Sequence, residues 1–96
     1  MPDDQFRNRK ILVVDDEADI RSTISDILTD EGYAVTVAGD AADARREVQR
    51  AVPDLILLDV WMPDIDGITL LREWTDAGTP DCPVVILSGH GTVETA

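Results

Sequence analysis

The sequence has 96 residues, which is the length of a single domain. With 44% hydrophobic residues, of which few are aromatic, it can build an aliphatic core, which excludes a wholly disordered chain. Its net charge of −12 would repel a phosphate backbone, so we expect no direct nucleic-acid binding by this chain. No apolar run approaches the roughly 20 residues that span a bilayer, and the first residues lack the apolar stretch of a secretory signal. We therefore expect a cytoplasmic protein that does not associate with membranes.

The first part of the chain predicts a strand, a helix and a second strand. Residues 1–9 form a polar lead-in, and residues 11–14 are a continuous apolar run, typical of a strand buried in a parallel sheet. A helix follows the acidic residues 15–17, with one face formed by Ile20, Ile24, Ile27 and Leu28. Gly32 is typical of a helix end, and residues 33–38 predict the second strand.

The middle of the chain predicts two further helices around a third strand. Asp40 is a candidate N-cap for a helix that ends before Pro53 and has its inward face at Ala41, Ala44, Val48 and Ala51. Residues 54–59 repeat the apolar run of the first strand and also end in a carboxylate. After a turn-rich stretch, Asp66 or Gly67 starts a helix that residues 77–80 end. Its inward face is expected at Ile68, Leu71 and Trp74, with Leu70 beside them.

The end of the chain predicts a fourth strand at residues 83–88, then a loop and a helix start at Thr92. Only four residues follow Thr92, too few to nucleate a helix or bury an apolar face. We therefore expect the chain to lack a last strand and helix. Their loss would expose a sheet edge, through which the chain could form a homodimer.

This alternation predicts an α/β fold, a doubly wound parallel sheet with helices on both faces. In such sheets, ligands bind beyond the carboxyl ends of the strands. Asp15 and Asp16 follow the first strand, Asp59 closes the third, and Ser88 closes the fourth. Three carboxylates and a hydroxyl are therefore expected to converge at one edge.

Clustered carboxylates repel one another unless a cation neutralises them. Mg²⁺ prefers oxygen ligands and shares its coordination with phosphate groups, which favours phosphoryl chemistry. Beside such a metal, one carboxylate can act as a nucleophile and form an acyl phosphate. Asp59, the lone carboxylate at its strand end, is the better candidate for the nucleophile, and the pair Asp15 and Asp16 for holding the metal.

Four segments together resemble the receiver domain of response regulators in bacterial two-component signalling: residues 11–17, 55–63, 66–67 and 85–91. The resemblance runs from about Lys10 to the end of the chain, and it implies a flavodoxin-like receiver domain at residues 10–96 that is incomplete at its C-terminus. Residues 59–63 and 88–96 are similar to regulators of the nitrogen-regulation type, which carry ATPase and DNA-binding domains downstream.

The resemblance also implies roles for single residues. Asp59 would accept a phosphoryl group from a sensor histidine kinase, and Asp16, Asp59 and the backbone carbonyl of Trp61 would bind Mg²⁺, with Asp15 supporting the metal through water. Ser88 corresponds to the switch hydroxyl of the family. The change would reach an output domain of the parent protein, transcriptional and of the sigma-54-activator kind. The module would phosphorylate and dephosphorylate itself and would not be an enzyme. The lysine with which the family pairs the phosphoryl group would lie beyond Ala96.

The site residues also have structural interpretations. Asp15 and Asp16 could cap the next helix, Ser88 could bond to its own loop, and Trp61 could cover a helix end. His90 and Cys82 are more typical of loop residues without a chemical role.

Two other functions stay open. One is a Mg²⁺-dependent phosphatase with an aspartate nucleophile, and the other is a dimerisation module that does not depend on phosphorylation. Such phosphatases carry a second aspartate two positions after the nucleophile, where this chain has Trp61, and this argues against turnover.

Overall fold

The computed structural model describes residues 9–87. Its elements in chain order are β1 (Lys10–Val14), α1 (Ala18–Asp30), β2 (Ala34–Ala38), α2 (Ala41–Arg50), β3 (Leu55–Asp59), α3 (Gly67–Ala77) and β4 (Val84–Leu87). The predicted alternation is confirmed, with bounds that differ by one or two residues. The expectations for Ser88, His90 and Thr92 lie outside the described residues.

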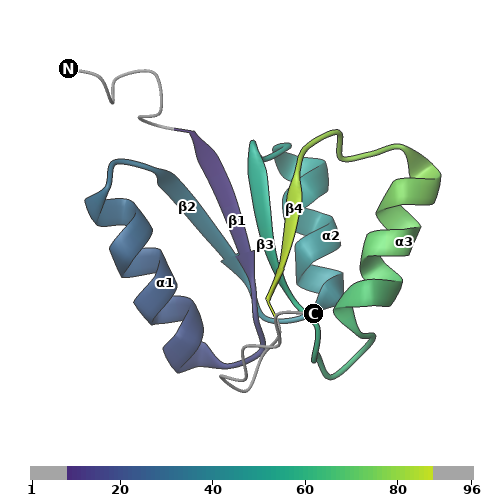
Figure 1. Cartoon of the computed structure of the whole chain (residues 1–96), viewed down its shortest axis with the longest axis horizontal. Coiled ribbons are helices and arrows are strands. Elements are labelled where there is room, and N and C mark those ends of the chain that lie inside the picture. Colours follow the sequence, from purple (N-terminus) through teal and green to yellow (C-terminus); the bar gives the residue numbers. More distant parts are fainter. Residues whose placement is uncertain (1–8, 88–96) are drawn as a thin grey trace.

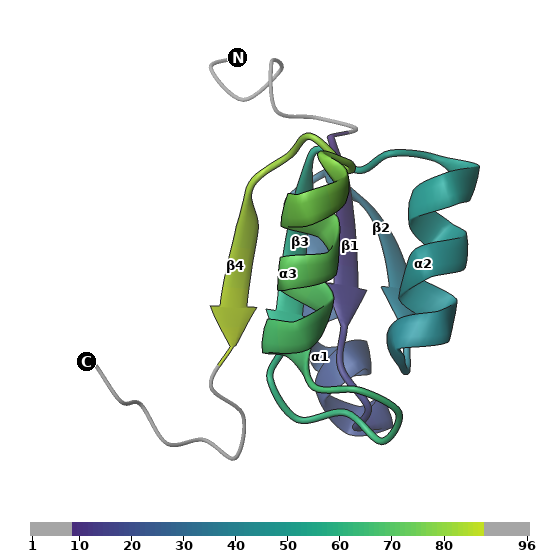
Figure 2. The same ribbon diagram turned by 90° about the vertical axis from the view of Figure 1, so that its right-hand side faces the viewer.

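The four strands form one parallel sheet in the order β2-β1-β3-β4. Helix α1 covers one face, and α2 and α3 cover the other (Figures 1 and 2). This is the predicted doubly wound α/β sheet. The chain leaves β1 for β2 on one side and then crosses to β3 on the other, so the strand order reverses between β1 and β3. Ligand sites of open α/β sheets form at this point.

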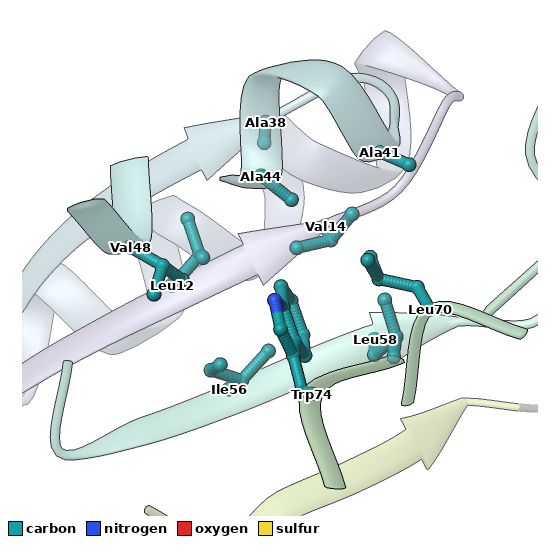
Figure 3. Close-up of a cluster of buried hydrophobic side chains, with 10 residues drawn as sticks. All are labelled: Leu12, Val14, Ala38, Ala41, Ala44, Val48, Ile56, Leu58, Leu70 and Trp74. Carbon is teal, nitrogen blue, oxygen red and sulfur yellow. The ribbon is translucent and has the colours of Figure 1, made fainter. Parts of the chain in front are cut away.

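The core lies between the sheet and the helices α2 and α3 (Figure 3). Side chains from the two central strands meet Leu70 and Trp74 of α3 and the small buried face of α2, which comprises Ala41, Ala44 and Val48 as predicted. The expectation for Ile68 was wrong, because its side chain is 39% exposed. The expectations for Trp74 and Leu70 are confirmed, and Leu71 packs partly against the core. The buried residues Gly67, Leu70 and Trp74 lie three and four residues apart and form one stripe.

The predicted inward face of α1 is only partly buried. Ile24 and Leu28 are half-buried, whereas Ile20 and Ile27 are 39% and 58% exposed. The spacing predicts the helix and the face that turns towards the sheet. How deeply that face is buried depends on the neighbours that cover it, which the spacing does not contain.

The helix ends follow the local residues that predicted them. Asp40 accepts a hydrogen bond from the Asp43 N–H at 2.8 Å, and Asp66 accepts one from the Thr69 N–H at 2.8 Å. Gly78 ends α3 with a φ of 73°, a left-handed backbone that glycine adopts without steric cost. None of the helices within residues 9–87 is long and apolar enough to cross a membrane.

Candidate functional site

Three carboxylates meet at the carboxyl ends of the central strands. Asp15 directly follows β1 and Asp59 is the last residue of β3, and the register that pairs Val14 with Leu58 sets these two residues side by side. Asp15, Asp16 and Asp59 each offer an oxygen, and the three oxygens lie within 4.8 Å of one another. Asp15 and Asp59 are buried and Asp16 is exposed. The structure thus brings together the predicted carboxylates at the strand-order reversal.

Asp15 is held by the end of β2, by the backbone of the following loop and by α1. Its N–H donates to the carbonyl of Ala38 at the end of β2 at 3.1 Å, and its Oδ1 accepts the Glu17 N–H at 2.9 Å. The Arg21 guanidinium on α1 donates to the Asp15 carbonyl at 2.7 Å. The capping interpretation is not confirmed for Asp15, because its carboxylate accepts the N–H of Glu17, which is itself the N-cap residue of α1, and not an N–H of the first helical turn.

The electrostatic environment of Asp59 is typical of a ligand-binding site and not of an ordinary turn residue. Burial, together with the charges of Asp15 and Asp16, raises its pKa, while the backbone N–H groups of Trp61 and Val60 oppose this shift. Its Oδ1 is buried, and no group within residues 9–87 donates a hydrogen bond to it. A buried carboxylate oxygen without a donor is costly unless a cation binds it. The orphaned oxygen and the all-oxygen donor set fit a hard divalent cation such as Mg²⁺.

The loop between β3 and α3 turns back sharply against Asp59. The Val60 N–H donates to the Leu87 carbonyl at 3.2 Å, and the Val60 carbonyl accepts the Gly67 N–H at 2.7 Å. A Cβ on Gly67 would lie 2.2 Å from the Asp59 carbonyl oxygen, so only glycine allows α3 to begin this close to the strand. The Trp61 side chain is 55% exposed, and its backbone lies directly after the cluster.

Asp64, in the same loop, makes hydrogen bonds that the sequence pattern does not reveal. Its Oδ1 accepts the N–H groups of Ala41 at 3.1 Å and Ile65 at 2.9 Å, and its Oδ2 accepts the Ala42 N–H at 3.1 Å. Burial alone would raise the pKa of Asp64, but these three backbone donors, together with the N–H of Asp64 itself, outweigh burial and lower the pKa. Two of the donors lie 22 and 23 residues away on α2, beyond the reach of any local motif.

A groove of about 380 Å³ lies elsewhere, between α1 and the sheet. Its lining is almost wholly apolar and includes Ile11, Leu28, Tyr33 and Leu55. It shares no lining residue with the acidic cluster, so its size does not bear on the chemistry of the three carboxylates.

Comparison with known proteins agrees with this geometry. The family model described as the response regulator receiver domain matches residues 11–96. The nitrogen assimilation regulatory protein NtrX of Azorhizobium caulinodans is 46% identical over 88 residues, which are 90% of this chain and 19% of that protein. The crystal structure of the NtrX receiver domain from Brucella abortus is 44% identical with a TM-score of 0.76, and the match covers 84% of this chain and 68% of that one. The solution structure of a beryllofluoride-activated NtrC4 receiver domain dimer is 39% identical with a TM-score of 0.77, covering 88% and 69%. The chain spans about a fifth of the length of the curated NtrX relatives.

Proposed function

The chain belongs to the response regulator receiver domain family, and from this membership we propose that Asp59 is the residue on which it accepts a phosphoryl group. A receiver domain is a signalling module of two-component systems and not an enzyme in the ordinary sense. The observation that carries the proposal is the buried Asp59 carboxylate, which faces Asp15 and Asp16 and has an oxygen without a donor among residues 9–87.

The transfer would proceed by direct displacement. A carboxylate oxygen of Asp59 attacks the phosphorus of a phosphohistidine, the new O–P bond forms, and the P–N bond breaks with its electron pair going to the imidazole. Asp16, Asp59 and the Trp61 backbone carbonyl would hold Mg²⁺, and Asp15 would support the metal through water. When bound, Mg²⁺ neutralises the clustered charge and draws charge from the phosphoryl oxygens. The pairing of β1 with β3 keeps the carboxylates in place before the phosphodonor arrives.

The switch would start from the added charge. Phosphorylation adds about −1.5 to −2 charge at Asp59, next to two carboxylates. Ser88 directly follows Leu87, which is paired in register with Asp59, and this supports its assignment as the hydroxyl that bonds the phosphoryl group. The self-phosphorylation and self-dephosphorylation of the module belong to the same proposal.

The wider setting of the domain is also a proposal. Residues 10–96 would form the receiver domain after a polar lead-in at residues 1–9, and the domain would act in the cytoplasm between a sensor histidine kinase and an output domain of its parent protein. The NtrX relatives, which are regulators about five times as long as this chain, support a transcriptional output. A homodimer through the outer edge of β4 stays a prediction, which sedimentation of the chain at several concentrations would test.

Intact-mass spectrometry after incubation with Mg²⁺ and acetyl phosphate tests the central proposal. We expect one adduct of about 80 Da that needs Mg²⁺ and is absent from Asp59→Asn, as acyl-phosphate chemistry requires. Asp54→Asn is the matched control. Asp54 directly precedes β3, at the end of the strand opposite to Asp59, and it lies outside the acidic cluster.

The other outcomes identify the alternatives. Continuous release of inorganic phosphate from the donor by the wild-type chain would indicate a phosphatase. A wild-type chain that is folded by circular dichroism yet takes up no phosphoryl group would indicate a module that does not depend on phosphorylation.

A further inference from the structure

We propose that Asp64 is a positioning residue, which ties the loop between β3 and α3 to the start of α2 and so holds the Trp61 backbone in place against Asp59. The expected effect on Mg²⁺ binding rests on the proposed function, in which the Trp61 carbonyl is a Mg²⁺ ligand. The tie itself does not depend on that function.

The contact between Asp64 and α2 is bidentate. The two carboxylate oxygens each accept one N–H from the first turn of α2, from Ala41 and from Ala42, at 3.1 Å. The next N–H along the helix, that of Asp43, is already taken by Asp40, which is the N-cap of α2. A carboxylate at a helix N-terminus also benefits from the helix dipole. Asp64 therefore does not replace the local cap of α2 but adds a link from a distant segment.

The start of α2 is a firm anchor for this link. Ala41 is fully buried, and Ala41 and Ala44 both belong to the central core cluster (Figure 3). Asp64 is thus bonded to a part of the backbone that core packing holds against the sheet.

The loop between β3 and α3 carries the Trp61 backbone, which must stay close to Asp59. Its two ends are joined by the hydrogen bond from Gly67 N–H to the Val60 carbonyl, and Met62 and Ile65 pack partly against the core. Trp61 lies between these points, and burial cannot hold it because its side chain is 55% exposed. The Trp61 N–H nevertheless acts on the Asp59 carboxylate, whose pKa it lowers against the effect of burial. A loop released from α2 would let both the Trp61 N–H and the Trp61 carbonyl move away from Asp59.

Mg²⁺ titration of Asp64→Ala against Asp40→Ala separates positioning from general stability. Both substitutions remove a carboxylate that caps the same helix, but only Asp64 also belongs to the loop. We expect Asp64→Ala to weaken Mg²⁺ binding about tenfold, as loss of a group that orients a metal ligand does. Asp40→Ala should keep the wild-type Mg²⁺ affinity. Asp64→Asn retains one acceptor oxygen and should recover part of the loss.

Backbone hydrogen exchange by NMR without metal measures the tie directly. We expect the amides of Trp61 and Gly67 to exchange about tenfold faster in Asp64→Ala than in the wild type, because the local opening of the loop costs less. Asp40→Ala should leave both rates unchanged. Equal exchange rates in Asp64→Ala and the wild type would overturn the proposal, as would equal Mg²⁺ affinities.

The two readouts also separate this inference from the proposed function. A wild-type chain that binds no Mg²⁺ would refute the metal site, while the exchange rates would still decide whether Asp64 anchors the loop. If Asp64→Ala is too unstable to study, Asp64→Asn is measured against Asp40→Asn by the same exchange experiment, with the same two outcomes.

Discussion

Substitution of Gly67 by alanine tests how closely α3 approaches the end of β3. The new Cβ would lie 2.2 Å from the Asp59 carbonyl oxygen and 3.1 Å from the Cα of Val60. Both atoms belong to the backbone, so neither can turn aside as the end of a flexible side chain could. We therefore expect Gly67→Ala to force α3 away from the strand and to lower the free energy of unfolding.

The magnitude follows from two opposing effects. The methyl group would sit about 1 Å inside ordinary van der Waals contact, which places the overpacking cost near the upper end of its usual range, about 3 kcal/mol. Alanine has a better helix propensity than glycine by about 1 kcal/mol. The net loss is therefore about 2 kcal/mol, which corresponds to a fall in Tm of roughly 10 °C for a domain of this size.

Urea unfolding followed by circular dichroism measures this loss, with Gly78→Ala as the matched control. Gly78 ends the same helix with a φ of 73° and has nothing within 4 Å of its Cβ position. Its replacement should cost about 1 kcal/mol of backbone strain and leave Mg²⁺ binding unchanged. Gly67→Ala should weaken Mg²⁺ binding as well, because the clash displaces the backbone of Asp59. A Gly67→Ala variant as stable as the wild type would refute the close approach.

Three further predictions concern charge. Asp59→Asn removes a buried charge that lies beside two other carboxylates. It should therefore raise the free energy of unfolding of the metal-free chain by on the order of 1 kcal/mol, measured by urea unfolding. A loss of stability would contradict this prediction. Burial and the neighbouring carboxylates raise the pKa of Asp59, so the metal-free fold should gain stability as the pH falls through that pKa, while Mg²⁺ affinity declines over the same range in a calorimetric titration. A Mg²⁺ affinity that does not change with pH there would argue against Asp59 as a ligand. Glu73→Gln breaks the bidentate pair with Arg45 between α3 and α2, and should cost only about 0.5 kcal/mol, less in high salt, because both side chains are substantially exposed.

The parts of the site that the sequence predicted are those that local residues and sheet topology determine together. An apolar run followed by a carboxylate marks the end of a buried parallel strand, and the strand order then brings Asp15 and Asp59 together. The caps Asp40 and Asp66 were predictable for a similar reason, since each bonds to a backbone N–H three residues away.

What the sequence did not predict depends on contacts between distant segments. Asp64 resembles an ordinary turn residue because its partners on α2 are more than 20 residues away. The orientation of α3 was predicted only in part: Trp74 and Leu70 are buried and Leu71 packs partly against the core, but Ile68 is exposed. The apolar residues of α3 allow more than one inward stripe, and the close approach of Gly67 to the strand selects the stripe that buries Leu70 and leaves Ile68 exposed.

The raised pKa of Asp59 implies that the clustered negative charges destabilise the metal-free fold. Asp59 is buried next to two carboxylates with an oxygen that has no donor within residues 9–87, an arrangement that a structural role would not require. A ligand that binds only the folded state stabilises it in proportion to the logarithm of its concentration over its Kd. Mg²⁺ bound at this cluster would therefore raise the stability of the whole sheet, and neutralising the site by Asp59→Asn should remove that dependence on Mg²⁺. The unfavourable charge at the end of β3 would thus couple Mg²⁺ binding at this cluster to the packing of β1, β3 and α3.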